Sequence, residues 1–73
     1  MKYKRIYNLG LGYCHILEEQ NGIYLIYIEN NMQHFLTCNY VSKSDYSFMG
    51  SIYYDDIITA TKDFAKRVSE CCL

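Results

Sequence analysis

The pattern of apolar and polar positions predicts a short central strand. Residues 23–28 form an uninterrupted apolar run, Ile-Tyr-Leu-Ile-Tyr-Ile, bounded by Gly22 and Glu29. Six residues are too few for a stable helix and match the length of a strand. Because side chains alternate across a strand, both faces of this one are apolar and both need a cover.

The turn before the central strand predicts a hairpin with a strand over 13–19. Gln20-Asn21-Gly22 fits a three-residue loop closed by a glycine in the left-handed region. This loop would place Ile16 opposite Ile26, so that apolar side chains pair across the hairpin. A two-residue Asn-Gly loop is the alternative, and it would shift the register and set a glutamate beside an apolar residue.

The turn after the central strand predicts a third strand over 33–41. Asn30-Asn31 is the candidate turn, because asparagine tolerates the positive φ of a type I′ hairpin. With this turn, Ile26 would lie opposite Phe35. The first two hairpins would then share the central strand.

One convincing helix is predicted, over about 56–71. Asp56 is a good N-cap, since its carboxylate can accept from the first free amide groups. Apolar residues at helical spacing fill an arc of about 160°. The members of this arc are Ile57, Ile58, Ala60, Phe64, Ala65, Val68, Cys71 and Cys72. With short strands over 2–8 and 52–54, the chain predicts an α+β fold: an antiparallel meander of three to five strands with the helix on one face.

A single helix covers one face of a sheet, so the other face needs a different cover. We consider a protein partner, a second copy of the chain, and the segment 42–51 ahead of the helix. That segment contains Tyr46, Phe48 and Met49, which makes it too apolar for an idle linker. We expect a homodimer, because a chain of 73 residues buries only about 60% of its unfolded surface and a second copy would add stability.

Charge and composition narrow the classes of function. The formal net charge of −1 argues against a protein whose main work is neutralising a phosphate backbone, and against a strongly acidic mimic of nucleic acid. No apolar stretch approaches the about 20 residues that span a membrane, and no apolar signal segment follows the first five residues. We therefore expect a single domain, residues 1–73, in the cytoplasm, or the host cytoplasm if a phage encodes it, with reduced cysteines.

Cysteine and histidine side chains invite a metal site, but their spacing argues against one. Cys14, His15, His34 and Cys38 are zinc-type ligands. However, Cys14 and His15 are neighbours on a strand and point to opposite faces, and buried structural thiols are the expected role of the cysteines. His15 and His34 flank Tyr27 in a row that could move protons near neutral pH, yet no nucleophile or orienting carboxylate can be assigned to it. We therefore expect a protein that is not an enzyme and that binds no metal or cofactor.

Tyrosine content favours a protein-binding surface. The chain has nine tyrosines, and tyrosine is over-represented at protein interfaces because it combines a large area with a polar tip. We expect a non-enzymatic module that binds a protein through one sheet face and through the segment ahead of the helix. The expected partner-binding residues are Tyr13, His15, Tyr27, His34, Tyr40, Tyr46, Phe48 and Met49.

The N-terminal strand supports an alternative function, the binding of single-stranded nucleic acid. Tyr3, Arg5 and Tyr7 share one face of that strand, where they could stack on bases and contact phosphates. No basic stripe accompanies them elsewhere in the chain. A simple edge strand with solvated basic residues is the plainer interpretation.

Residues 53–64 read Tyr-Tyr-Asp-Asp-Ile-Ile-Thr-Ala-Thr-Lys-Asp-Phe, a predicted strand that turns into the helix. This segment resembles the strand-to-helix ending of small orphan proteins from low-GC bacteria and their phages. Some proteins of that kind inhibit bacterial defence complexes such as CRISPR effectors by stoichiometric binding. The resemblance implies a viral, anti-CRISPR type of inhibitor as the most concrete form of the binding function, and it transfers no functional residue.

Overall fold

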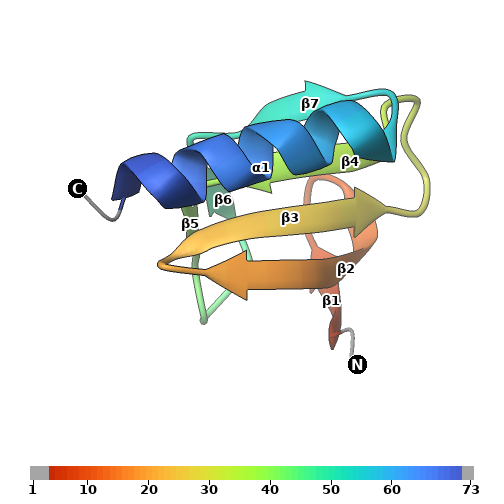
Figure 1. Cartoon of the computed structure of the whole chain (residues 1–73). Coiled ribbons are helices and arrows are strands. Elements are labelled where there is room, and N and C mark those ends of the chain that lie inside the picture. Colours follow the sequence, from red (N-terminus) through yellow and green to blue (C-terminus); the bar gives the residue numbers. More distant parts are fainter. Residues whose placement is uncertain (1–3, 72–73) are drawn as a thin grey trace.

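A computed structural model describes residues 4–71 and contains a five-stranded antiparallel sheet with one helix (Figure 1). The sheet has the order β1-β2-β3-β4-β7. Its strands are β1 (Lys4–Asn8), β2 (Gly12–Gln20), β3 (Ile23–Ile28), β4 (Phe35–Cys38) and β7 (Ile52–Tyr54). A second sheet pairs β5 (Tyr40–Val41) with β6 (Phe48–Met49), and α1 spans Ile57–Cys71. The predicted α+β meander with one C-terminal helix is confirmed.

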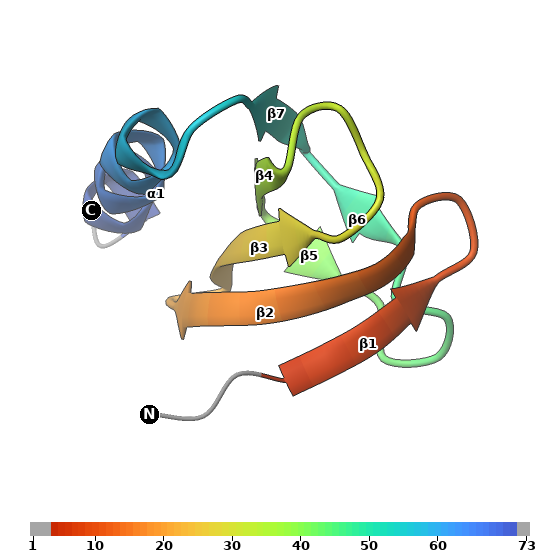
Figure 2. The ribbon, with the colours of Figure 1, turned by 90° about the vertical axis from the view of Figure 1, so that its right-hand side faces the viewer.

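Apolar cores lie on both faces of the five-stranded sheet. On the helix side, Ile23 and Leu25 pack with Ala60 and Phe64. On the opposite face, which we call the second face, the buried residues are Ile6, Cys14, Ile26, Ile28, Leu36, Cys38 and Val41. Figure 2 shows α1 on one side of β3 and the β5–β6 pair on the other. The segment ahead of the helix therefore covers the second face, and that face gives no reason for a second copy.

The β2–β3 hairpin has the two-residue Asn21-Gly22 turn and keeps part of the register that the three-residue loop predicts. The pairing of Ile16 with Ile26 is as predicted. Asn21 and Gly22 have φ angles of 55° and 79°, the two positive values of a two-residue turn. The register shifts between Ile16 and Glu18, which places the glutamate opposite a leucine of β3. The predicted three-residue loop is wrong, because Gln20 pairs with Ile23 and leaves a two-residue turn. A bulge in β2 absorbs the change of register that the shorter turn imposes, so Ile16 still pairs with Ile26.

The predicted register of β3 and β4 is wrong by one residue. Ile26 lies opposite Leu36 and not opposite Phe35. The connection is longer than a two-residue asparagine turn, and the backbone amide of Ile28 donates to the carbonyl of His34 at 2.7 Å. Because side chains alternate, the slip moves Leu36 into the second-face core and Phe35 to the helix side.

The predicted third strand divides into two pieces. β4 ends at Cys38, and the backbone amide of Asn39 donates to the carbonyl of Met49 at 2.9 Å. Tyr40 and Val41 then pair with β6 instead of β3. The chain thereby leaves the first sheet and brings residues 42–49 to the second face.

The helix begins as predicted but buries less of its apolar arc than we expected. The Asp56 carboxylate accepts from the backbone amide of Thr59 at 2.8 Å, which is the geometry of an N-cap. Ile58 is 67% exposed and Ile57 is 41% exposed. The arc residues that pack toward the sheet are Ala60, Phe64 and Val68. The core therefore buries only the part of the apolar arc that contains these three residues.

A set of hydrogen bonds and ion pairs, which we call the polar clamp, fixes α1 over one half of the sheet. Thr37 Oγ1 donates to Asp63 Oδ2 at 2.6 Å, and Arg67 Nε lies 3.1 Å from the same oxygen. Arg67 Nη1 also donates to Asn39 Oδ1 at 2.9 Å and to the Gly50 carbonyl at 2.8 Å. These contacts hold the helix against β3, β4 and β7, and β1 and β2 extend beyond it (Figure 2).

Candidate functional site

The helix side of β1 and β2, together with the end of β3, forms a surface that α1 does not cover. A row of paired residues crosses it: Arg5 lies opposite His15, and His15 lies opposite Tyr27. The row continues through Phe35 to Tyr54, which pack in the core beneath the helix. We call the uncovered surface the open half. Its residues are Arg5, Tyr7, Tyr13, His15, Tyr27, Glu29 and His34.

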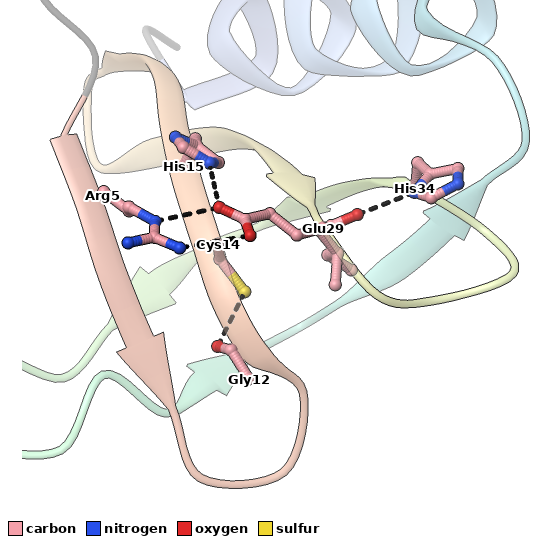
Figure 3. A network of polar contacts seen from close by, with 7 residues as sticks. Arg5, Gly12, Cys14, His15, Glu29 and His34 are labelled. Atoms are coloured by element: carbon pink, nitrogen blue, oxygen red, sulfur yellow. Dashed lines mark hydrogen bonds and ion pairs between the residues drawn. The ribbon is translucent and has the colours of Figure 1, made fainter.

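Glu29 is the centre of a polar network on the open half (Figure 3). Its carboxylate accepts from Arg5 Nε at 2.9 Å and Nη2 at 3.2 Å, and from His15 Nε2 at 2.6 Å. The hydrogen bonds from Arg5 and then from His15 hold the pKa of the Glu29 carboxyl below its usual range, and the pKa of Arg5 is raised in turn. A planar guanidinium that donates twice to one carboxylate fixes the orientation of both groups. The network thus ties side chains of β1 and β2 to the residue that follows β3.

Ring contacts hold the tyrosines at one end of the open half. The Arg5 guanidinium lies 3.8 Å from the centre of the Tyr13 ring, a cation–π contact. Tyr7 meets the same ring edge to face, with ring centres 5.0 Å apart. Tyr7 is 51% exposed and Tyr13 is 44% exposed. Both rings are accessible from solvent, and their neighbours limit their motion.

Tyr27 lies between two histidines, as the sequence predicts. Its ring centre is 5.9 Å from that of His15 and 5.4 Å from that of His34, and the His34 ring is nearly parallel to it. His34 Nδ1 donates to the Ile28 carbonyl at 2.7 Å (Figure 3). Because a carbonyl only accepts, this nitrogen carries the proton. The row is therefore oriented by hydrogen bonds at both ends.

The predicted binding residues do not form one surface. Tyr13, His15, Tyr27 and His34 gather on the open half, and Arg5 and Tyr7 share that face as predicted. Tyr40 and Met49 are exposed on the β5–β6 pair, on the far side of the sheet. Tyr46 and Phe48 are half-buried and pack against the second-face core, and their role in partner binding stays a prediction. Tyr3 lies outside the described residues.

Two parts of the site were missed from the sequence. The first is Glu29, which the sequence places directly after the apolar run of the central strand. The second is a side of α1 formed by Ile57, Thr61 and Ala65, which are exposed and spaced four residues apart. We call this side the helix flank. By helical spacing it lies on the same side as Val68, which packs in the core that includes Leu17 of β2, so the flank borders the open half.

Two of the thiols, those of Cys14 and Cys38, lie in the second-face core. Cys14 and Cys38 are fully buried, and burial raises the pKa of each thiol to about 11. Such thiols stay protonated and are poor nucleophiles. Within residues 4–71, no group of three or more His, Cys, Asp or Glu side chains is placed to hold a metal ion. The open half offers aromatic side chains around the contacts of Glu29 with Arg5 and His15.

The same described residues contain no helix that is long and apolar enough to cross a membrane. The resemblance of residues 53–64 to small bacterial and phage proteins stays a prediction. Comparison of the chain with protein-family models, with curated proteins and with solved structures finds no match.

Proposed function

We propose that the protein is a non-enzymatic protein-binding module and that the open half is its docking surface. One observation carries the proposal: tyrosine, histidine and arginine side chains lie on bare sheet, and hydrogen bonds and ring contacts hold them in place. Tyrosine and arginine are enriched where binding energy concentrates at interfaces. Side chains that are already ordered lose less conformational entropy on binding.

The charge of the open half favours a protein over a nucleic acid. Among the described residues, Arg5 is the one lysine or arginine on this surface, and Glu29 accepts two hydrogen bonds from it. Lys4 points to the second face, where its Nζ lies 5.5 Å from the centre of the Tyr46 ring. A phosphate would meet a guanidinium that is already paired, with no second fixed cation beside it.

Single-stranded nucleic acid is the second candidate, because Arg5 and Tyr7 share an exposed face. Fluorescence anisotropy with a labelled oligonucleotide separates the two candidates. Binding that is tight at low salt and weakens steeply with added salt would favour nucleic acid. We expect no binding at low salt.

Site-specific photo-crosslinking tests the proposed docking surface. A photoreactive phenylalanine analogue replaces Tyr13 in one variant and Met32 in the control, which is 95% exposed on the β3–β4 connection. In the cell that encodes the protein, we expect a discrete adduct from position 13 and none from position 32. Adducts from both positions, or from neither, would contradict a docking role for the open half.

The specific form of the proposal is a stoichiometric inhibitor of a bacterial defence complex that acts in the host cytoplasm. It follows from the resemblance of residues 53–64. Expression of the chain in a CRISPR-protected strain should restore plaque formation by a targeted phage, and Tyr13→Ala should reduce the effect while Met32→Ala should not. If the strain stays fully resistant to the phage while it expresses the wild-type chain, the inhibitor proposal is refuted. The general binding function is then tested by the crosslinking experiment alone.

A further inference from the structure

We propose that a second copy of this chain occupies the open half, in a two-fold dimer in which α1 of each copy lies on the open half of the other. The inference rests on the proposed function, since it names an occupant of the same docking surface. In this dimer the two helices lie side by side between the two sheets. Shape, the composition of the helix flank, charge and buried area each point to this arrangement.

The helix is narrower than the sheet on which it packs. Five strands about 4.8 Å apart make a sheet roughly 19 Å wide, whereas a helix with its side chains is about 10 Å wide. One helix therefore covers about half of the sheet, and Figure 2 shows α1 on one side with β1 and β2 extending beyond it. The bare width accepts one further helix. A two-fold axis parallel to α1 sets the helix of each copy on the bare strands of the other.

The helix flank forms the seam of this dimer. Ile57, Thr61 and Ala65 recur every four residues and are exposed, and none carries a charge. An axis parallel to α1 brings each of them beside its own equivalent in the second copy, an isologous contact. The small side chains of Thr61 and Ala65 allow the two helices to approach closely. The apolar residues that the monomer core leaves unused are thereby buried.

The charges across the proposed interface are complementary. Lys62 and Lys66 are exposed on the side of α1 opposite to Phe64, where the second copy's sheet would lie. The polar clamp joins Asp63 to Thr37, which shares a row of the sheet with Leu25 and Glu18. Rotation about an axis parallel to the helix does not change the position of a residue along that axis. Lys62, the neighbour of Asp63, therefore lies near Glu18 of the second copy.

Exposed Ile58 lies about one helical turn before Lys62 and also points away from its own sheet. At this level, the second copy presents the row that contains Arg5, His15 and Tyr27. An aliphatic side chain on this aromatic row completes the contact. In the proposed dimer, Ile58 of one copy therefore lies over the rings of the other copy's open half, and the ammonium group of Lys62 lies near Glu18.

The buried area suits a dimer of moderate affinity. A helix of 15 residues is about 22 Å long. A standard specific interface buries about 600–1,000 Å² per partner, and in this dimer each copy contributes the outer side of α1, the helix flank and the bare strands. We expect a dissociation constant in the micromolar range.

Light scattering coupled to size exclusion tests the dimer. From about 1 µM to about 1 mM, the wild-type mass should rise from 8.7 kDa toward twice that value. Ala65→Glu puts like charges on both sides of the seam and should keep the mass at the monomer value, whereas Met32→Glu should dimerise like the wild type. Lys62→Glu should weaken the dimer at least tenfold, and adding Glu18→Lys should restore it.

A disulfide trap tests the parallel arrangement. In a background with Cys71 and Cys72 replaced by serine, Thr61→Cys should form an intermolecular disulfide on mild oxidation, while Met32→Cys should not. A monomer at every concentration overturns the inference and leaves the crosslinking at Tyr13 to decide the proposed function. If Ala65→Glu leaves the dimer intact, or if Thr61→Cys forms no intermolecular disulfide, the dimer uses another surface, and this result also overturns the inference.

Discussion

Replacing Thr37 by valine tests the polar clamp that confines the helix to one half of the sheet. Thr37 is fully buried, and its hydroxyl donates to Asp63 at 2.6 Å. Valine has nearly the same shape, so the change removes a hydrogen bond without opening a cavity. A hydrogen bond to a charged group contributes about 1.5–3 kcal/mol to stability. Because the Asp63 side chain is 19% exposed and water replaces part of the lost contact, we expect a loss of about 1–2 kcal/mol.

The pH dependence of this loss identifies its cause. Burial raises the pKa of the Asp63 carboxyl, but the hydrogen bonds from Thr37 and Tyr54 and the charge of Arg67 outweigh burial and leave the pKa below its ordinary value of 3.8. A depressed pKa in the folded state means that the carboxylate stabilises the fold above pH 3.8 and stops doing so as the pH falls through the folded-state pKa. The deficit of Thr37→Val should therefore be full at neutral pH and shrink in acid.

Urea unfolding followed by circular dichroism measures both effects. At neutral pH, a loss of 1 kcal/mol should also lower the melting temperature by about 4–8 °C in a domain of this size. Thr37→Ser is the matched control, since it keeps the hydroxyl and loses only the methyl group. If Thr37→Val matches the wild type at neutral pH, or if its deficit is the same at every pH, the hydroxyl does not hold the helix through Asp63.

Other perturbations test the turn, the core and the thiols. Gly22→Ala should destabilise the fold by about 1 kcal/mol in urea unfolding, because φ is 79° and no atom lies within 4 Å of the new methyl group to compensate; an unchanged midpoint would mean that the turn relaxes. Leu36→Ala should lower the free energy of unfolding by about 2–5 kcal/mol, because the observed register of β4 buries this side chain in the second-face core; a much smaller loss would contradict that burial. At about pH 8, a thiol reagent read out by peptide mass spectrometry should label Cys71 at once and reach Cys14 and Cys38 only in urea; rapid labelling of either would refute their burial.

Several elements of this fold are local in origin and could be predicted from the sequence. The apolar run at 23–28 matches β3 residue for residue, and Asp56 caps the helix as expected. The register of β4 could not be predicted in the same way. Phe35 and Leu36 are adjacent apolar residues, so either register buries one of them on each face, and the asparagine pair at 30–31 favours a tight turn that the longer connection from residue 29 to 34 does not adopt.

The candidate site depends on contacts between distant parts of the chain. Arg5 reaches Glu29 only because β1, β2 and β3 pair in sequence order, and no local pattern specifies that ion pair. The apolar arc of the helix likewise shows which residues avoid water but not how many of them the sheet can accept. The polar clamp settles that question, since Asp63 and Arg67 pull the helix toward β4 and leave Ile57 and Ala65 exposed.

The limited width of the open half would make the two proposed binding events there mutually exclusive. A surface with room for one helix cannot hold a second copy and another protein at the same time. If the proposed dimer forms, each chain bound to a second copy is unavailable to another partner, so the apparent affinity for that partner would fall as the total concentration rises past the dissociation constant of the proposed dimer. Activity per molecule would then be greatest when the protein is scarce, and overproduction would limit itself.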